Sequence, residues 1–147
     1  MDNYYPPVGF HFKVTFKGIT EETDTRFQEV TGLTATVNTE DVVEGGVNRF
    51  VHKLPKGTSY DNLVLKRGIM KDSKLVDWCQ KAIEELTFEP KDILVSLLNE
   101  KNDPLCSWNI INAYPVKWAF SGLNAESGEL LIENMEFNYQ YFNVQNL

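Results

Sequence analysis

Many segments of this 147-residue chain alternate apolar and polar positions with a period of two. Near the N-terminus, Phe10, Phe12, Val14 and Phe16 are separated by polar residues; near the C-terminus, Met135, Phe137, Tyr139 and Tyr141 are spaced in the same way. A period of two is typical of a strand with one buried face. The pattern predicts strands over about 10–17, 26–39, 49–54, 60–66, 93–99, 105–112, 116–121 and 130–142.

One segment has the period of an α-helix instead. Its apolar residues recur at three- and four-residue intervals and predict a stripe on one helix face. Asp72 or Ser73 can cap its first turn, and Pro90 ends it. We expect the stripe to anchor the helix to the core through Leu75, Trp78, Cys79, Ala82 and Ile83.

Glycine and proline mark the predicted breaks. Gly32 shifts the alternation within its strand, which predicts a β-bulge. Gly45 and Gly46 favour a tight reversal, so residues 40–48 are expected to form an acidic, projecting hairpin arm. The segment 55–57 is predicted to be a turn, and Tyr114-Pro115 to interrupt the following strand.

These elements predict a mainly β fold. We expect a β-sandwich or β-barrel of seven or eight strands with one packed helix and an extended hairpin arm. The length is that of one domain, residues 1–147. Long regular strands leave edges that a protein must pair or cover.

The composition and charge of the chain argue against some classes of function. A net charge of −7 and a pI near 4.8 argue against non-specific nucleic-acid binding, which needs clustered Lys and Arg. Cys79 and Cys106 are expected to be buried thiols, with a disulfide as the alternative. The N-terminus lacks the features of a secretion signal and no run is long enough to span a membrane, so folding in the cytoplasm is expected.

The sequence contains no recognisable motif of a catalytic, cofactor-binding or metal-binding site. The sequence lacks a P-loop, a nucleophile elbow and a cysteine or histidine pair with metal-ligand spacing. His11 and His52 each lie in a predicted strand without a nucleophile motif beside them. We therefore predict no catalytic, cofactor or metal site, and no enzyme activity.

Several segments in one order resemble a known family. They are 6–12, 27–33, 44–48, 63–68, Trp78 on the helix, 108–117 and 123–125. In this order and approximate spacing they resemble the tail tube protein family of contractile phage tails and contractile injection systems. The resemblance covers almost the whole chain.

The resemblance implies a structural role in self-assembly. Subunits of that family form hexameric rings that stack into a hollow conduit, which is driven through a target envelope when a surrounding sheath contracts. The implied partners are copies of the chain itself, the sheath protein, and baseplate and terminator proteins. Protein or DNA cargo would pass through the lumen without specific binding, and the subunit itself would not insert into a membrane. A ring-forming type VI secretion tube or cargo-binding protein, and a tube–baseplate adaptor ring, remain alternatives.

The resemblance also implies that rings stack through the hairpin arm. The predicted ring-stacking arm comprises Glu40, Asp41, Val42, Val43, Glu44, Gly45, Gly46, Val47 and Asn48. A basic stretch follows it, and its predicted counter-surface comprises Arg49, Lys53, Lys56, Lys66 and Arg67. We expect the acidic arm of one ring to meet this basic surface on the next.

Overall fold

The computed structural model describes residues 11–20, 26–43, 45, 51–69, 72–122 and 131–146. The predicted strand ends at residues 10, 49–50 and 130, and the segment 123–125, lie outside the described residues. In chain order the elements are β1 (His11–Phe16), β2 (Arg26–Phe27), β3 (Glu29–Thr31), β4 (Ala35–Val42), β5 (His52–Tyr60), β6 (Leu63–Gly68), α1 (Lys74–Glu85), β7 (Lys91–Leu98), β8 (Pro104–Ser121), β9 (Ile132–Asn138) and β10 (Tyr141–Gln145).

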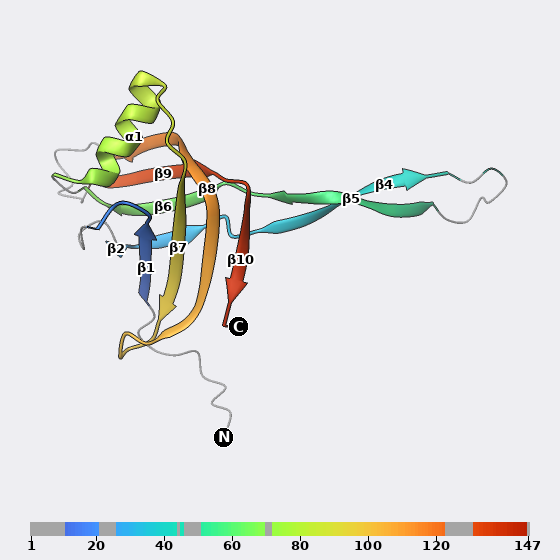
Figure 1. The fold of residues 1–147 in the computed structure, drawn as a ribbon, viewed down its shortest axis with the longest axis horizontal. Coiled ribbons are helices and arrows are strands. Elements are labelled where there is room, and N and C mark those ends of the chain that lie inside the picture. Colours follow the sequence, from blue (N-terminus) through green and yellow to red (C-terminus); the bar gives the residue numbers. More distant parts are fainter. Residues whose placement is uncertain are drawn as a thin grey trace.

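Eight of these strands form one antiparallel sheet that closes on itself. Its order is β2-β1-β7-β8-β9-β6-β3, and β10 pairs with β8 beside this path. The first and last strands of the path, β2 and β3, are separated only by Gln28, whose backbone N–H donates to the carbonyl of Lys66 at 2.8 Å. The chain therefore joins the two ends of the sheet, and the predicted barrel with one helix is confirmed (Figure 1).

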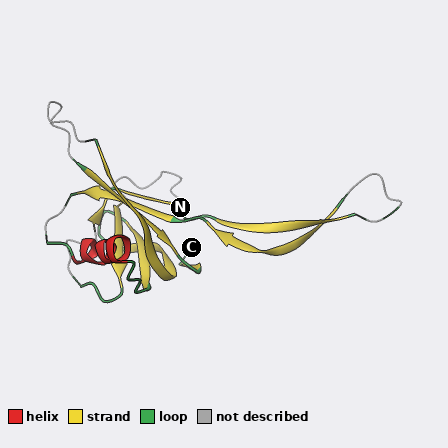
Figure 2. Cartoon of the chain, turned by 90° about the horizontal axis from the view of Figure 1, so that it is seen from above, coloured by secondary structure: helices red, strands yellow, loops and turns green. Residues whose placement is uncertain are grey.

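The core lies between the barrel wall and α1, which covers one side of the strands (Figure 2). The Trp78 ring stacks on Phe137 at 5.5 Å between centroids and meets Phe16 edge-on at 5.9 Å. Ser73 caps the helix by accepting a hydrogen bond from the Val76 N–H at 3.3 Å. Buried strand residues complete the core: Val14, Phe27, Leu63, Leu65, Ile93, Val95, Ile110, Ala113 and Met135.

The apolar stripe of α1 is buried over only part of its length. Leu75, Trp78, Cys79 and Ala82 are buried, whereas Ile83 is 40% exposed. Figure 1 shows the C-terminal end of the helix rising beyond the strands, which explains the exposure. The expectation that Ile83 anchors the core is wrong. Cys79 and Cys106 are both buried thiols, as expected, and they do not form a disulfide.

Two predicted breaks at proline are wrong. β5 runs through residues 55–57 without a turn, and β8 runs through Pro115 as one strand of 18 residues. In both places the register shifts by one residue, so each proline lies at a bulge. A bulge leaves a residue outside the ladder, and a missing N–H is tolerated there.

Other predicted strands are divided. The segment 26–39 is split into β2, β3 and β4, the segment 60–66 is broken at Asp61 and Asn62, and the segment 130–142 is broken at Tyr139 and Gln140. These divisions raise the count from the expected seven or eight to ten strands in the described parts of the chain. The breaks at residues 32–34 and 61–62 lie where the chain passes between the barrel sheet and the separate β4–β5 sheet.

Candidate functional site: a projecting hairpin arm

The most prominent surface feature is a two-stranded arm. Among the described strands, β4 and β5 pair only with each other, from Ala35 opposite Tyr60 to Val42 opposite His52. Figures 1 and 2 show the arm leaving the barrel as a long twisted ribbon. Every β4 residue is exposed, as is every β5 residue except Tyr60. The arm therefore begins at residue 35, earlier than the predicted 40–48.

A glycine at the base of the arm permits the chain to leave the barrel. Gly32 has φ = +91°, and a Cβ there would lie 1.9 Å from the backbone oxygen of Asn62. Only glycine fits such a close backbone approach at positive φ. Thr34 donates its N–H to the Gly32 carbonyl, and Asp61 donates to the Thr34 carbonyl. Gly32 is thus a strand break between β3 and the arm, and the bulge predicted there is wrong.

Aromatic side chains fix the base of the arm to the barrel. The Tyr60 ring lies 5.1 Å from Phe142 and 5.9 Å from Tyr139, centroid to centroid. The Tyr139 hydroxyl donates to the Gly32 carbonyl at 3.5 Å. Burial, with smaller contributions from Asp61 and Tyr60, raises the pKa of Tyr139 from 10.0 to about 12. The fold therefore favours the neutral phenol.

This raised pKa predicts a loss of stability in alkali. Because the folded pKa of Tyr139 is the higher one, its contribution is complete below pH 10 and is lost as the pH rises towards 12. Denaturant titrations between pH 9 and 12 should show a smaller decline for Tyr139→Phe than for the wild type. Parallel declines in the two proteins would contradict this assignment.

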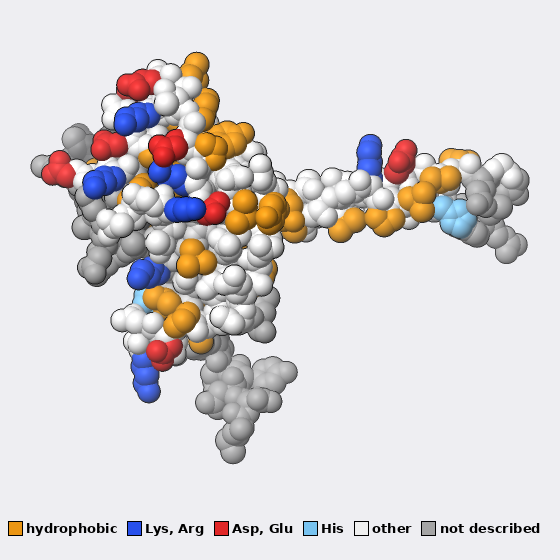
Figure 3. Space-filling view, viewed as in Figure 1, with side chains coloured by type: hydrophobic (Ala, Val, Ile, Leu, Met, Phe, Trp, Pro, Cys, Tyr) orange, Lys and Arg blue, Asp and Glu red, His pale blue; other side chains and the backbone are white. Residues whose placement is uncertain are grey.

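The charges of the arm compensate one another. Asp41 faces Lys53 across the two strands, and Glu40 and Lys56 lie on the same ribbon. The described part of the arm therefore carries two acidic and two basic side chains. Figure 3 shows one basic and one acidic side chain standing together on its upper edge. The remaining predicted arm and counter-surface residues Glu44, Gly46, Val47, Asn48 and Arg49 lie outside the described residues.

The described residues of the predicted basic counter-surface do not lie together on one surface, and the placement of Arg67 there is wrong. Lys53 and Lys56 belong to the arm itself. Lys66 pairs with Glu29 across β6 and β3 at 3.4 Å. Arg67 is only 2% exposed and its Nε lies 3.2 Å from Glu133 Oε2 inside the barrel. Alternation along β6 turns Arg67 inward with Leu63 and Leu65, so it cannot meet another ring.

The arm also exposes large apolar side chains. In Figure 3 hydrophobic side chains follow the lower edge of the arm towards its tip. The large apolar residues exposed on the described arm are Val37, Val42, Val43, Val51 and Leu54. A contiguous apolar run on a thin two-stranded ribbon has no core of its own to enter, and such surfaces mark protein–protein contacts.

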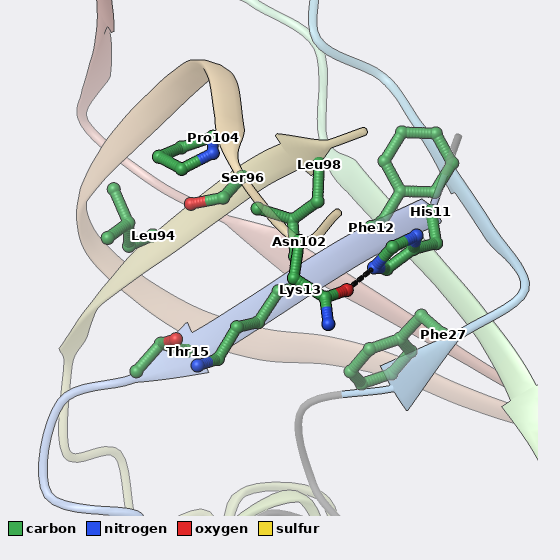
Figure 4. Close-up of a pocket in the computed structure, with 10 residues that line it drawn as sticks. All are labelled: His11, Phe12, Lys13, Thr15, Phe27, Leu94, Ser96, Leu98, Asn102 and Pro104. Carbon is green, nitrogen blue, oxygen red and sulfur yellow. Dashed lines mark hydrogen bonds between the residues drawn. The ribbon is translucent and has the colours of Figure 1, made fainter. Parts of the chain in front are cut away.

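A second feature is a hollow of about 830 Å³ on the outer face of β1 and β7 (Figure 4). His11 and Asn102 approach each other at its edge, with Nε2 and Oδ1 2.6 Å apart. Its lining includes Lys13, Thr15 and Ser96 but neither a carboxylate nor a cysteine.

The described residues contain neither a cluster of metal-ligating side chains nor a membrane-spanning helix. Across these stretches no three His, Cys, Asp or Glu side chains come together in a way that could hold a metal ion. None of the described segments forms a helix with the length and apolarity needed to cross a bilayer.

Comparison with known proteins links the arm and barrel to tail tubes. The family model described as T4-like virus tail tube protein gp19 matches residues 8–143. A chain from the anti-feeding prophage baseplate is 28% identical, with a TM-score of 0.83 over 98% of this chain and 97% of that one. A chain from the sheath–tube complex of PVC, an extracellular contractile injection system, is 25% identical, with a TM-score of 0.79 over 98% and 94%.

A more distant structure shares the fold alone. Hcp1 from Salmonella typhimurium is 12% identical, with a TM-score of 0.58 over 93% of this chain and 86% of that one. No match was found among curated protein sequences.

Proposed function

We propose, from the premise that this chain belongs to the T4-like virus tail tube protein family, that its subunits close into hexameric rings which stack through the β4–β5 arm. The chain is a structural subunit of the inner tube of a contractile tail or injection system. The observation that carries the stacking role is the arm itself, an exposed ribbon with apolar side chains and no partner strand outside the hairpin in the described residues.

The partners proposed for the tube follow from the relatives. Similar chains occur in a baseplate, in a tube-terminating cap and in a sheath–tube complex. We therefore propose that a sheath protein surrounds the tube that this chain forms, and that baseplate and terminator proteins bind the ends of the tube. Cargo would pass through the lumen without specific binding or catalysis, and the tube would be built from subunits folded in the cytoplasm. The type VI secretion alternative is supported only by relatives that share the fold.

Burial of apolar side chains, more than charge, should hold the rings together. The described charges of the arm cancel, and exposed ion pairs are worth only about 0–1 kcal/mol each. Apolar area contributes about 25 cal/mol per Å² removed from water, and every subunit of a ring repeats the contact. Repeated contacts act together once one has formed, so a weak single contact becomes strong by avidity.

Shortening the arm should abolish stacking without unfolding the barrel. In the proposed variant, Asn-Gly replaces residues 41–53 and joins the facing partners Glu40 and Leu54 by a two-residue hairpin turn. The variant should melt close to the wild type, because no described residue of the removed segment belongs to the barrel core. Negative-stain microscopy should show single rings where the wild type forms long tubes.

A charge-only variant is the matched control. Asp41→Asn with Lys53→Gln keeps the arm's length and apolar side chains but removes one cross-strand pair. It should still form tubes. Long tubes from the shortened variant would overturn the arm's role, and loss of tubes in the control would show that charge dominates.

A further inference from the structure

The arm joins the barrel through two short connections, which together are called the neck. Residues 32–34 lead from β3 into β4, and residues 61–62 lead from β5 back into β6. Figure 2 shows the ribbon leaving the barrel at this narrow point. Among the described strands no ladder ties β4 or β5 to the barrel sheet. The direction of the arm therefore depends on contacts at and beside the neck.

The two connections of the neck are fixed to each other. The Gly32 backbone lies against the backbone oxygen of Asn62, in the space that a side chain would fill. The N–H of Asp61 donates to the carbonyl of Thr34 at 3.2 Å. The outgoing and returning chains therefore form one unit, and only the orientation of this unit on the barrel remains to be set.

The side chain of Asn62 ties this unit to the strand β9. Its Nδ2 donates to Glu136 Oε2 at 3.2 Å, and its Oδ1 accepts from Asn138 Nδ2 at 3.0 Å. Leu63 faces Phe137 in the β6–β9 ladder, which brings Asn62 beside the end of β9. One amide thus uses its donor and its acceptor on two residues of the same barrel strand.

These hydrogen bonds differ in kind from the aromatic contacts at the base of the arm. The rings of Tyr60, Tyr139 and Phe142 gain from apolar burial, which is not directional. Hydrogen bonds weaken steeply as their angle departs from linearity. Rotation of the neck would strain both bonds of Asn62 at once, while the rings could slide and stay in contact. The aromatic rings hold the arm to the barrel, and Asn62 sets its angle.

We propose that Asn62 is the positioning residue of the arm: its hydrogen bonds to Glu136 and Asn138 hold the arm at one angle to the barrel before any ring meets the next. This inference rests on the proposed function and deepens it, since it names the side chains that aim the stacking element.

A fixed angle favours stacking for an entropic reason. A swinging arm loses orientational freedom when it binds, and that loss opposes association, whereas an arm already held in the bound direction avoids it. Every subunit of a ring repeats this gain, and the contacts of one ring act together.

Reversal of the hydrogen-bond polarity tests the role of Asn62. Asn62→Asp removes the donor and sets a second carboxylate against Glu136, so it should release the arm. Adding Glu136→Gln supplies an amide that can donate to the new carboxylate, and Asn138 can still donate to it as well. The double variant should therefore restore the angle. Asn38→Asp is the matched control, because it makes the same change at an exposed position of the arm itself.

Pulsed electron paramagnetic resonance measures the spread of arm positions. Nitroxides are placed on Lys53→Cys in the arm and Lys81→Cys on α1, and the native Cys79 and Cys106 are buried. An excess of unlabelled protein of the same variant, at a concentration without tubes, restricts the signal to distances within one subunit. The otherwise unchanged protein, Asn38→Asp and the double variant should give a narrow distribution, and Asn62→Asp a broad one. Asn62→Ala removes both hydrogen bonds without adding charge, so it should also broaden the distribution and serves as the test if Asn62→Asp does not fold.

Tube growth connects the angle of the arm to stacking. Asn62→Asp should raise the lowest protein concentration that yields tubes by about tenfold or more, because every arm of a ring has lost its preorganisation. The double variant should grow tubes at nearly the wild-type concentration. Circular dichroism melts of the same variants show whether the barrel stays folded.

The two readouts separate this inference from the proposed function. A narrow distance distribution in both Asn62→Asp and Asn62→Ala would overturn the positioning role, as would a broad one in the double variant. A broad distribution with unchanged tube growth would also overturn it, while the tube function would stand. A wild type that forms neither rings nor tubes would overturn the proposed assembly, and the distance distributions would still decide whether Asn62 fixes the arm.

Discussion

Replacing Trp78 by alanine should lower the free energy of unfolding by about 3–5 kcal/mol, the usual cost of truncating a buried tryptophan. The side chain is 6% exposed, stacks on Phe137 and meets Phe16 edge-on. Its Nε1–H also donates to the carbonyl of Glu89 at 2.9 Å, which ties the helix to the segment that follows it. Alanine would leave a cavity between the helix and the sheet. Urea unfolding followed by circular dichroism gives the measurement.

Two variants on the same helix are controls. Trp78→Phe keeps a ring against Phe137 but loses the hydrogen bond, so it should cost less than alanine. Ile83→Ala lies on the part of the stripe that extends beyond the strands, and should cost about 1 kcal/mol or less. Equal losses for Trp78→Ala and Ile83→Ala would mean that the helix packs differently against the barrel.

The spacing of apolar residues predicted the helix and those strands whose buried face can be recognised from their own residues alone. Two residues, Asp72 and Ser73, were predicted as possible caps of the helix. Ser73 is the cap in the structure, because its hydroxyl accepts a hydrogen bond from the N–H of Val76. The strand that became β1 was predicted because its inner face is apolar and its outer face is polar. Its burial needed no knowledge of distant partners.

The arm was only partly predictable. Gly45 and Gly46 indicated a reversal, but the arm's length depends on where the chain leaves the barrel. That point is set by the approach of Gly32 to Asn62, a contact between residues thirty positions apart. Pro55 looked like a turn, because the sequence does not show that β5 is an edge strand with a bulge.

The misplacement of Arg67 is the most instructive correction. Arg67 was assigned to a surface because of its charge, although it falls in phase with Leu63 and Leu65. Glu133 likewise falls in phase with Met135 and Phe137. Two opposite charges, each on the inner parity of its strand, were a signal of a buried pair. Only the strand pairing of β6 with β9 shows that they are partners.

This buried pair connects three strands to the helix. Arg67 Nε donates to Glu133 Oε2 at 3.2 Å, and Trp118 Nε1 donates to Glu133 Oε1 at 2.7 Å. Arg67 Nη2 donates to the Ser73 hydroxyl at 2.7 Å, and that hydroxyl caps α1. The guanidinium also lies over the ring of Phe27 at 5.4 Å. The network therefore positions the helix start on the barrel.

Glu133→Gln should lower the free energy of unfolding by about 3–5 kcal/mol, because it removes the negative charge that lies 3.2 Å from the buried guanidinium of Arg67. Glutamine has nearly the shape of glutamate and its oxygen can still accept from Trp118, so the loss would report charge and not packing. Denaturant unfolding of Glu133→Gln, Arg67→Met and the double variant completes a double-mutant cycle. The double variant buries no charge at these positions, so it should lose less stability than the sum of the two single variants. Its remaining loss should reflect the hydrogen bond from Arg67 to Ser73. Ser73→Ala removes that bond together with the helix cap on Val76, so its cost sets an upper limit for this part. Strict additivity of Arg67→Met and Glu133→Gln would show that the two side chains stabilise the barrel independently, and that the helix cap does not depend on their pairing.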